Sequence, residues 1–420
     1  MPQPPILSHV MAYFLTSLRR GISAADFAAL DALTANEWEE LAQLAIQQRV
    51  APLLYWQWQA HRLPPALPAT AVERLERHYF QNALRNQCLR RELRVLLQAM
   101  REANIPVIVL KGAHLAASVY DDPAQRFMTD IDLLVRREHS EAAYHCLRQL
   151  GYDAAAPFLP EPYLACKHHF PALRRTGAVA EVELHWNLTP PHRAWSIDAE
   201  DLWKRAIPWS IAGTDALCLN PEDLLLHLCY HATHHHLSEL FWHGIGTVCD
   251  VDRVIRCHAA SLDWDAIGAR AQAWGWQKGV YLQMTLAAEL LGTPVPPRWL
   301  AALYPAGCEA EVWRAAQSHL FVRKGQAHRV TSGVTRLRQE TRLQDKGRYL
   351  WQILCPTPAE MDIRYRNDST PPGVWWSYPV HWLYLARRWS YKGWRLWRGD
   401  PLTPRLSEDQ YRVMKWLELR

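Results

Sequence analysis

Apolar residues recur at three- and four-residue spacing through residues 24–60, which predicts amphipathic helices there. One of these helices is expected to begin with Asn36 as its N-cap and Glu39 three residues later. After a proline-rich break, residues 71–103 contain few helix-breaking residues and are predicted to form one long helix. Residues 1–103 are therefore expected to form a helical region.

The hydrophobic pattern changes after Asn104, where short apolar runs begin to alternate with helical segments. Runs of this length bounded by turn residues are typical of buried strands. The expected strands are residues 107–110, 130–135, 168–175 and 179–186, the last two joined as a hairpin around 176–177. Strands and helices alternate only between residues 104 and 215, so this part is predicted to be an α/β unit.

The third part of the chain, residues 216–420, is predicted to be mainly helical. Asn220 is expected to cap a helix that has Pro221 in its first position. Helices should continue to about residue 300, followed by a basic helix near 309–345. A proline-rich loop at residues 356–373 then leads to a tail in which Arg and Lys alternate with Trp.

Composition narrows the class of protein. The chain has 420 residues, half of them apolar, so more than one domain and a sizeable core are expected. The net charge of +5 is too small to indicate nucleic-acid binding by itself. Nine cysteines occur without a CxxC pair, which favours free thiols in a reducing, cytoplasmic setting. We expect neither a signal peptide nor a transmembrane segment, because the apolar runs are short or interrupted by charge.

Asp130-Ile131-Asp132 is the feature that carries chemistry. Alternate residues of a strand share one face, so both carboxylates should point the same way. Two neighbouring carboxylates repel unless a cation lies between them, and Mg²⁺ often binds one or two carboxylates together with substrate phosphates. The spacing therefore suits a divalent metal that also holds a triphosphate.

Two further Asp-x-Asp triplets show why the setting of this one matters. Asp250 and Asp252 lie in a predicted helix, where residues two apart do not face each other. The pair beginning at Asp263 lies at a helix start, where acidic residues suit the helix dipole. Asp130 alone belongs to a strand that follows a strand–Gly–helix turn, and a later strand adds Glu183, with Glu181 as a second candidate on the same face. Three carboxylates in this arrangement are typical of two-metal phosphoryl transfer.

The segments IPVIVLKGAHLA, YDDPAQRFMTDIDLLV and VELHWNL resemble the uncharacterised bacterial nucleotidyltransferase family of the DNA polymerase beta-type superfamily. The resemblance extends over residues 40–300. It implies an α+β/α/β fold, in which a polymerase-beta-like core with a small mixed sheet is flanked by helices. The nucleotidyltransferase core would be residues 104–215, with helical regions at 1–103 and 216–420.

The same resemblance implies roles for individual residues. Asp130 and Asp132 would bind two Mg²⁺ (or Mn²⁺) ions. Glu183 would hold the catalytic metal and help to deprotonate the acceptor. His185 follows Glu183 by two and would orient a carboxylate, contact substrate or simply pack.

Phosphate binding would involve the turn after the first strand. Gly112 would admit the triphosphate, with Lys111 or Arg126 neutralising its charge. The alternatives are that Lys111 is a solvated turn residue and that Arg126 pairs with Asp121 or Asp122. Ala113 stands where the superfamily usually has Ser or Gly, and 16 residues, 114–129, separate it from Asp130. The implied activity is transfer of a nucleoside monophosphate from a nucleoside triphosphate to an acceptor, which could be a peptide or protein, a small molecule or RNA.

Two alternative functions belong to other classes. One is a non-catalytic protein that binds a nucleotide or a partner with the same fold. The other is a histidine-centred metal-binding hydrolase, because His227, His231 and His235 recur every four residues and share a helix face. The sequence lacks the His-Glu-x-x-His pattern of zinc proteases in this run, and the same face could instead close over the nucleotide.

The basic tail allows three interpretations. Its cations and Trp rings could stack on single-stranded nucleic acid, lie on a membrane surface, or belong to an amphipathic helix that packs on the core. The residues concerned are Arg387, Arg388, Lys392, Arg395, Arg398, Trp382, Trp389, Trp394 and Trp397.

Overall fold

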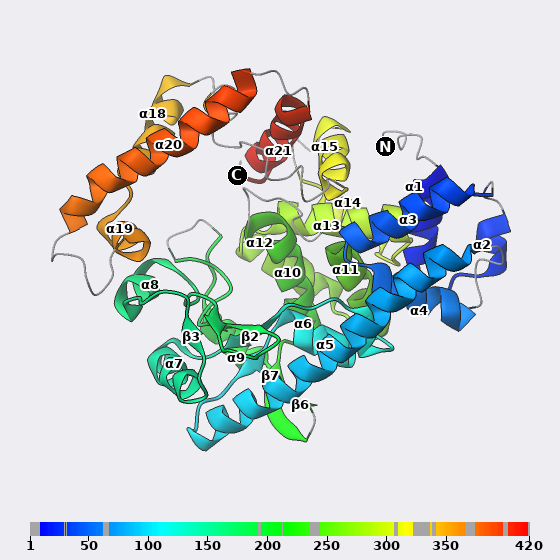
Figure 1. The fold of residues 1–420 in the computed structure, drawn as a ribbon, viewed down its shortest axis with the longest axis horizontal. Helices are drawn as coiled ribbons and strands as arrows, with labels where there is room; N and C mark the ends of the chain where they lie inside the picture. The colour runs from blue at the N-terminus through cyan, green and yellow to red at the C-terminus, as the bar shows by residue number, and fades with distance from the viewer. Residues whose placement is uncertain are drawn as a thin grey trace.

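A computed structural model describes residues 9–28, 30, 32–61, 67–191, 195–211, 213–235, 244–305, 310–321, 337, 342–365, 374–397 and 402–418. It contains a mixed seven-stranded sheet in the order β3-β4-β5-β2-β1-β7-β6. Strands β2, β3, β6 and β7 are labelled in the lower half of Figure 1. The strands are β1 (Ile108–Val109), β2 (Asp130–Leu134), β3 (Asp153–Ala154), β4 (Leu173–Arg174), β5 (Glu181–His185), β6 (Ile207–Ile211) and β7 (Thr214–Cys218). The prediction of a small mixed sheet flanked by helices is confirmed.

The four predicted strands are present, and β4 and β5 are antiparallel as expected. β3 and the β6–β7 hairpin were not predicted. β3 is two residues long, and β6 is an edge strand with Pro208 in it and Ile207 exposed, so neither shows the buried apolar run used to find the others. Because β7 ends at Cys218, the sheet extends beyond residue 215.

Helices α1 to α5 make up the N-terminal part, as predicted. They are α1 (His9–Leu18), α2 (Ala24–Ala28), α3 (Ala35–Gln47), α4 (Ala51–His61) and α5 (Ala69–Glu102). The predicted N-cap of α3 is wrong by two residues. Thr34 caps the helix in a capping box with Glu37, because the Thr34 hydroxyl accepts from the Glu37 N–H and the Glu37 carboxylate accepts from the Thr34 N–H.

The described helices after β1 form two groups: one lies between the strands of the sheet in sequence, and the other follows β7. The first group is α6 (Lys111–Ser118), α7 (Ser140–Gln149), α8 (Pro160–Cys166) and α9 (Ala199–Arg205). The second is α10 (Pro221–Tyr230), α11 (Ile245–Cys257), α12 (Trp264–Ala273), α13 (Gln277–Leu291), α14 (Pro297–Leu303), α15 (Ala310–Leu320), α18 (Leu343–Leu354), α19 (Pro358–Tyr365), α20 (Ser377–Trp397) and α21 (Leu402–Glu418). Asn220 caps α10 as expected, since its side chain accepts from the Asp223 N–H.

Two hydrophobic cores hold these elements together. One contains buried residues of α1, α3, α4, α10, α11, α13, α15 and α21, so the N-terminal and C-terminal helices share it. The other lies between the sheet, α7 and the second half of α5. The central strands face both: Leu134 belongs to the helical core, whereas Ile131 and Leu133 belong to the sheet core. Asp130 and Asp132 therefore lie on the face of β2 that looks toward the helical core.

The C-terminal tail differs in part from its prediction. The expected proline-rich loop contains α19, and the tail itself is helical as α20 (Figure 1). The buried His381 donates from Nε2 to the Ile353 carbonyl and is hydrogen-bonded through Nδ1 to Tyr365 Oη, and the Trp382 indole donates to the Leu354 carbonyl. Arg387 is exposed. Arg398 and the side chains of Arg388, Trp389, Lys392, Trp394, Arg395 and Trp397 lie outside the described residues.

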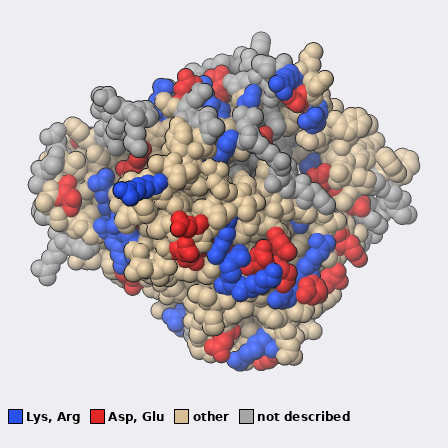
Figure 2. Space-filling model, turned by 180° about the vertical axis from the view of Figure 1, so that it is seen from behind, with Lys and Arg blue, Asp and Glu red and all other residues tan. Residues whose placement is uncertain are grey.

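Neither the surface charge nor the cysteines of the described residues indicate a particular function. Within the part of the chain that is described, no helix is both long and apolar enough to cross a bilayer. All eight cysteines in that part are free thiols, as predicted. Figure 2 shows acidic and basic side chains interspersed on the face opposite to that of Figure 1.

Candidate functional site

The register between β2 and β5 assembles the predicted acidic residues. These strands are parallel, and the pairing sets Asp132 opposite Glu183 and Leu134 opposite His185. The His185 Nε2 atom lies 3.1 Å from Asp132 Oδ1 and 3.3 Å from Glu183 Oε2. One potential ligand atom from each of these three side chains lies within 4.8 Å of the others.

Lys111 is part of this cluster and not a solvated turn residue. Its ammonium lies 2.9 Å from Asp132 Oδ1, and the side chain is almost fully buried. Burial acts to lower the pKa of Lys111, but the carboxylates of Asp132, Glu183 and Asp130 outweigh it and raise that pKa. Lys111 also has a positive φ of 37°, a backbone conformation that side-chain-bearing residues rarely adopt, so the turn holds it under strain.

Asp130 lies next to the cluster without contributing to the close group of three ligand atoms. Burial raises the pKa of Asp130 to about 6, and the negative charges of Asp132 and Glu183 add to this effect. A divalent cation bound between buried carboxylates would reduce the electrostatic repulsion between them. The carboxylate oxygens and one imidazole nitrogen of Asp132, Glu183 and His185 together form a group that could hold a metal ion.

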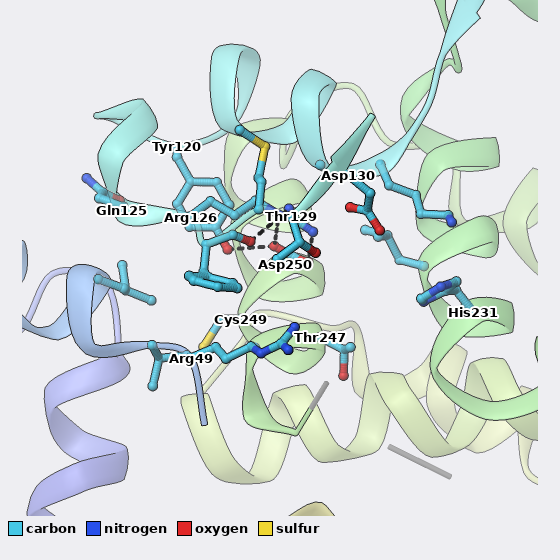
Figure 3. A pocket seen from close by; sticks show the side chains of 18 of the residues that line it. Arg49, Tyr120, Gln125, Arg126, Thr129, Asp130, His231, Thr247, Cys249 and Asp250 are labelled. Atoms are coloured by element: carbon cyan, nitrogen blue, oxygen red, sulfur yellow. Dashed lines mark hydrogen bonds and ion pairs between the residues drawn. The ribbon is translucent and has the colours of Figure 1, made fainter. Parts of the chain in front are cut away.

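A pocket opens beside Asp130 and Asp132, with a volume of about 100 Å³ (Figure 3). All three parts of the chain line it: Arg49 lies at the junction of α3 and α4, Gly112 in α6, and Thr247 in α11. Glu183 and His185 are not among the lining residues and adjoin the pocket through Asp132. The carboxylate pair thus forms the boundary between the acidic cluster and an open space.

Arg126 has a partner that sequence analysis did not foresee. Its Nε and Nη2 atoms donate to the two carboxylate oxygens of Asp250 at 2.9 Å each, and Tyr120 Oη donates to the same carboxylate at 2.7 Å. The suggested pairing of Arg126 with Asp121 or Asp122 is wrong. Asp121 pairs with Arg20, and Asp122 accepts from Tyr79 and from the Ala124 N–H.

Gly112 packs tightly against this Arg126–Asp250 pair. A Cβ atom on Gly112 would lie 2.9 Å from Arg126 Nη1 and 3.3 Å from Met128 Sδ. A side chain at residue 112 would therefore force the Arg126 guanidinium to shift, whatever else binds there. Ala113 is buried in the sheet core and does not line the pocket.

The histidine run lies near the acidic cluster. His227 is fully buried, and burial holds its pKa well below the usual range. His231 lines the pocket, with its ring centroid 6.4 Å from that of His227. The backbone of His231–His235 forms a π-helical turn, but the side chain of His235 lies outside the described residues. Among those that are described, the group that could share a metal is Asp132, Glu183 and His185, and neither His227 nor His231 belongs to it.

Sequence analysis missed Arg49, Tyr120 and Asp250 as pocket residues. Asp250 and Asp252 were predicted to lie in a helix and not to face each other. In the structure Asp250 pairs with Arg126, whereas Asp252 pairs with Arg253 and Arg256. No local pattern marks Arg49 and Asp250, because each reaches the site across a long stretch of sequence; Asp250 is 124 residues from Arg126. Tyr120 lies within the segment YDDPAQRFMTDIDLLV itself, where only the charged residues were assigned chemistry.

The sequence and the fold were compared with those of known proteins. No curated protein matches the sequence. A crystal structure of an antigenic nucleotidyltransferase-like protein from Paracoccidioides brasiliensis is 17% identical, with 49% of this chain and 93% of that chain covered and a TM-score of 0.28. The model of a family described as uncharacterised nucleotidyltransferases matches residues 34–292, which include every lining residue of the pocket. The chain therefore belongs to this uncharacterised nucleotidyltransferase family.

Proposed function

We propose that the protein transfers a nucleoside monophosphate from a nucleoside triphosphate to an acceptor hydroxyl or phosphate. The observation that carries the proposal is the meeting of Asp130 and Asp132 with Glu183 on paired strands, at the edge of a pocket. In this reaction an acceptor oxygen bonds to the α-phosphorus, the bond to the β-phosphate oxygen breaks, and pyrophosphate leaves.

Asp130, Asp132 and Glu183 would hold divalent cations, Mg²⁺ or Mn²⁺. When bound, such cations stabilise the negative charge on the attacking and leaving oxygens. His185 contacts both Asp132 and Glu183 through the same nitrogen and so fixes the two carboxylates relative to each other. Lys111 partly neutralises Asp132 and so reduces the repulsion among the buried carboxylates.

Replacing a carboxylate without changing its size tests the proposal. We expect Asp132→Asn and Glu183→Gln each to reduce nucleotidyl transfer by 100-fold or more, on the order of the effect of removing an electrostatic group from a transition state. The assay incubates the protein with each α-labelled nucleotide and Mg²⁺ or Mn²⁺ in cell extract and follows where the label goes.

Glu181 provides the matched control. It lies on the same strand opposite Asp130 but forms an exposed ion pair with Arg174, so Glu181→Gln should keep activity near that of the wild type. Folded Asp132→Asn and Glu183→Gln variants that transfer as fast as the wild type would refute the assignment. A wild-type protein that binds nucleotide but labels nothing would favour the non-catalytic alternative.

A further inference from the structure

The pocket contains three arginine or lysine side chains, and two of them are already neutralised. Lys111 pairs with Asp132, and Arg126 makes a two-pronged contact with Asp250. The third, Arg49, has no ion-pair partner among the described residues. Figure 3 shows its side chain extending toward Thr247, and none of the dashed contacts drawn there reaches it. Burial lowers the pKa of Arg49, and the Asp130 carboxylate opposes this effect without forming an ion pair with it. A partly buried guanidinium with no ion pair is costly unless an anion binds beside it.

Arg49 is also held in place by the backbone in an unusual way. It has a positive φ of 59° and occupies the position after the C-cap of α3. The N–H of Val50 donates to the Ala45 carbonyl and that of Arg49 to the Ile46 carbonyl, the pattern of a Schellman motif. Glycine is the usual residue at this position because a side chain strains it. An arginine kept there despite the strain suggests that its side chain has a use.

Neighbouring contacts orient the Arg49 side chain. Its guanidinium carbon lies 5.0 Å from the centroid of the Phe127 ring. The preceding residue, Gln48, accepts a hydrogen bond from the Ile245 N–H at 3.1 Å through its Oε1, which ties this turn to the first turn of α11. The N-terminal end of α11 carries partial positive charge and lines the same pocket through Gly246 and Thr247. Arg49 and α11 thus present positive charge to one space, next to Asp130.

We propose that Arg49 binds the triphosphate of the nucleotide, in the place that sequence analysis assigned to Lys111 or Arg126. The inference rests on the proposed function, since it takes the pocket to be the nucleotide site. It gives the N-terminal helical region a direct part in substrate binding. Guanidinium groups match phosphate oxygens through paired N–H donors, which suits an arginine better than a lysine here.

Binding measurements test this separately from catalysis. Isothermal titration calorimetry would use inorganic tripolyphosphate, which lacks a base, and the four ribonucleoside triphosphates. We expect Arg49→Gly to weaken binding of tripolyphosphate and of the preferred nucleotide by roughly 10- to 100-fold, the range for losing a charged hydrogen bond. Because glycine relieves the positive φ, the melting temperature of this variant should equal or exceed that of the wild type, so a loss of binding could not be attributed to unfolding. Arg49→Lys should recover only part of the binding.

Arg85 supplies the control. Its guanidinium also lies over Phe127, at 5.9 Å, but it faces a second cavity and does not line this pocket. Arg85→Gln should therefore bind tripolyphosphate as the wild type does. Equal binding by Arg49→Gly and wild type, or an equal loss in Arg85→Gln, would overturn the inference and leave the proposed function standing. Loss of binding in Arg49→Gly alone, in a protein whose wild type transfers no nucleotide, would support the inference and refute the proposed reaction. A wild type that binds none of the probes would overturn both.

Discussion

At the scale of single residues, Gly112 shows how a motif residue can be required by its neighbours. Glycine to alanine within a helix ordinarily stabilises by up to about 1 kcal/mol. At Gly112 the new Cβ would lie 2.9 Å from Arg126 Nη1, and the bidentate contact with Asp250 keeps that guanidinium from moving away. We expect Gly112→Ala to lower the free energy of unfolding by about 1–2 kcal/mol, as for an overpacked site.

The control for this prediction is Gly347, in the interior of α18, where an added Cβ would meet no atom within 4 Å. Gly347→Ala should leave the free energy of unfolding unchanged or raise it. Chemical denaturation of the two variants and the wild type makes the comparison. If Gly112→Ala proves as stable as Gly347→Ala, the close packing of Arg126 on the turn is not a constraint.

His114 offers a prediction about acid stability that is independent of the site chemistry. It is buried in α6 with its ring against Trp209, and its Nδ1 atom has no hydrogen-bond partner among the described residues. Burial, with a smaller effect of His258, lowers the pKa of His114 to about 4. In the unfolded chain this residue binds a proton below about pH 6.5, whereas in the folded protein it does so only below about pH 4. The free energy of unfolding therefore falls as the pH falls from 6.5 to 4.

From these two pKa values the loss attributable to His114 is roughly 3 kcal/mol between pH 7 and pH 4. His114→Gln cannot titrate, so its stability should decline less steeply over the same interval. Denaturant unfolding of both proteins at several pH values measures the difference. Parallel declines would show that His114 is protonated as easily in the folded protein as in the unfolded chain.

At the scale of elements, α5 holds the segment that carries Arg126. Asn86 Nδ2 donates to the carbonyls of Pro123 at 2.7 Å and Arg126 at 2.8 Å, and Asn82, one turn earlier, makes a similar pair of contacts. Asn86→Ala would remove the hydrogen bonds to the Pro123 and Arg126 carbonyls, of which only that of Arg126 still accepts from Asn82, and we expect it to cost about 1–2 kcal/mol. It should also weaken tripolyphosphate binding, because the pocket wall formed by this segment would loosen.

The adjacent Gln87 is exposed on the same helix, so Gln87→Ala should change the free energy of unfolding by less than about 0.5 kcal/mol. Thermal unfolding and calorimetric titration of the two variants provide both readouts. An Asn86→Ala protein with unaltered stability would mean that water replaces the amide and that α5 does not fix the segment.

The elements also show how far the sequence could predict this protein. β2 and β5 were found because their apolar residues alternate with acidic ones, and that alternation also sets which carboxylates share a face. The partner of Asp132 could be inferred, since Glu183 lies on a strand that has to pair somewhere in the sheet. Arg49 and Asp250 could not be found in this way. Arg49 lies in the turn after α3 and Asp250 lies in α11. The patterns of these helices indicate only which face is buried, and the approach of both residues to the pocket depends on how two helical regions pack together.

At the scale of the whole molecule, the shared helical core makes the N-terminal region a structural part of the C-terminal one. Arg253 Nη2 in α11 donates to the Leu18 carbonyl, and Gln48 receives the Ile245 N–H. Fully buried side chains such as Phe14 and Leu41 pack in the same cluster as Val248 and Leu286. Removing residues 1–66 would expose the apolar face that these helices cover. We expect the remaining chain, 67–420, to lose cooperative unfolding and to bind a hydrophobic dye, as proteins do when specific packing is lost.

Adding back the missing part tests whether packing alone is responsible. Co-expression of residues 1–66 with residues 67–420 should restore a folded complex, because the contacts between the two parts do not require a continuous chain. Circular dichroism and dye binding would follow the fragment with and without its complement, and tripolyphosphate binding would report on the pocket. A 67–420 fragment that unfolds cooperatively by itself would contradict the shared core. If the complemented pair binds tripolyphosphate only when residue 49 is arginine, the pocket is completed by the N-terminal helices, and this is why residues far from the sheet belong to the site.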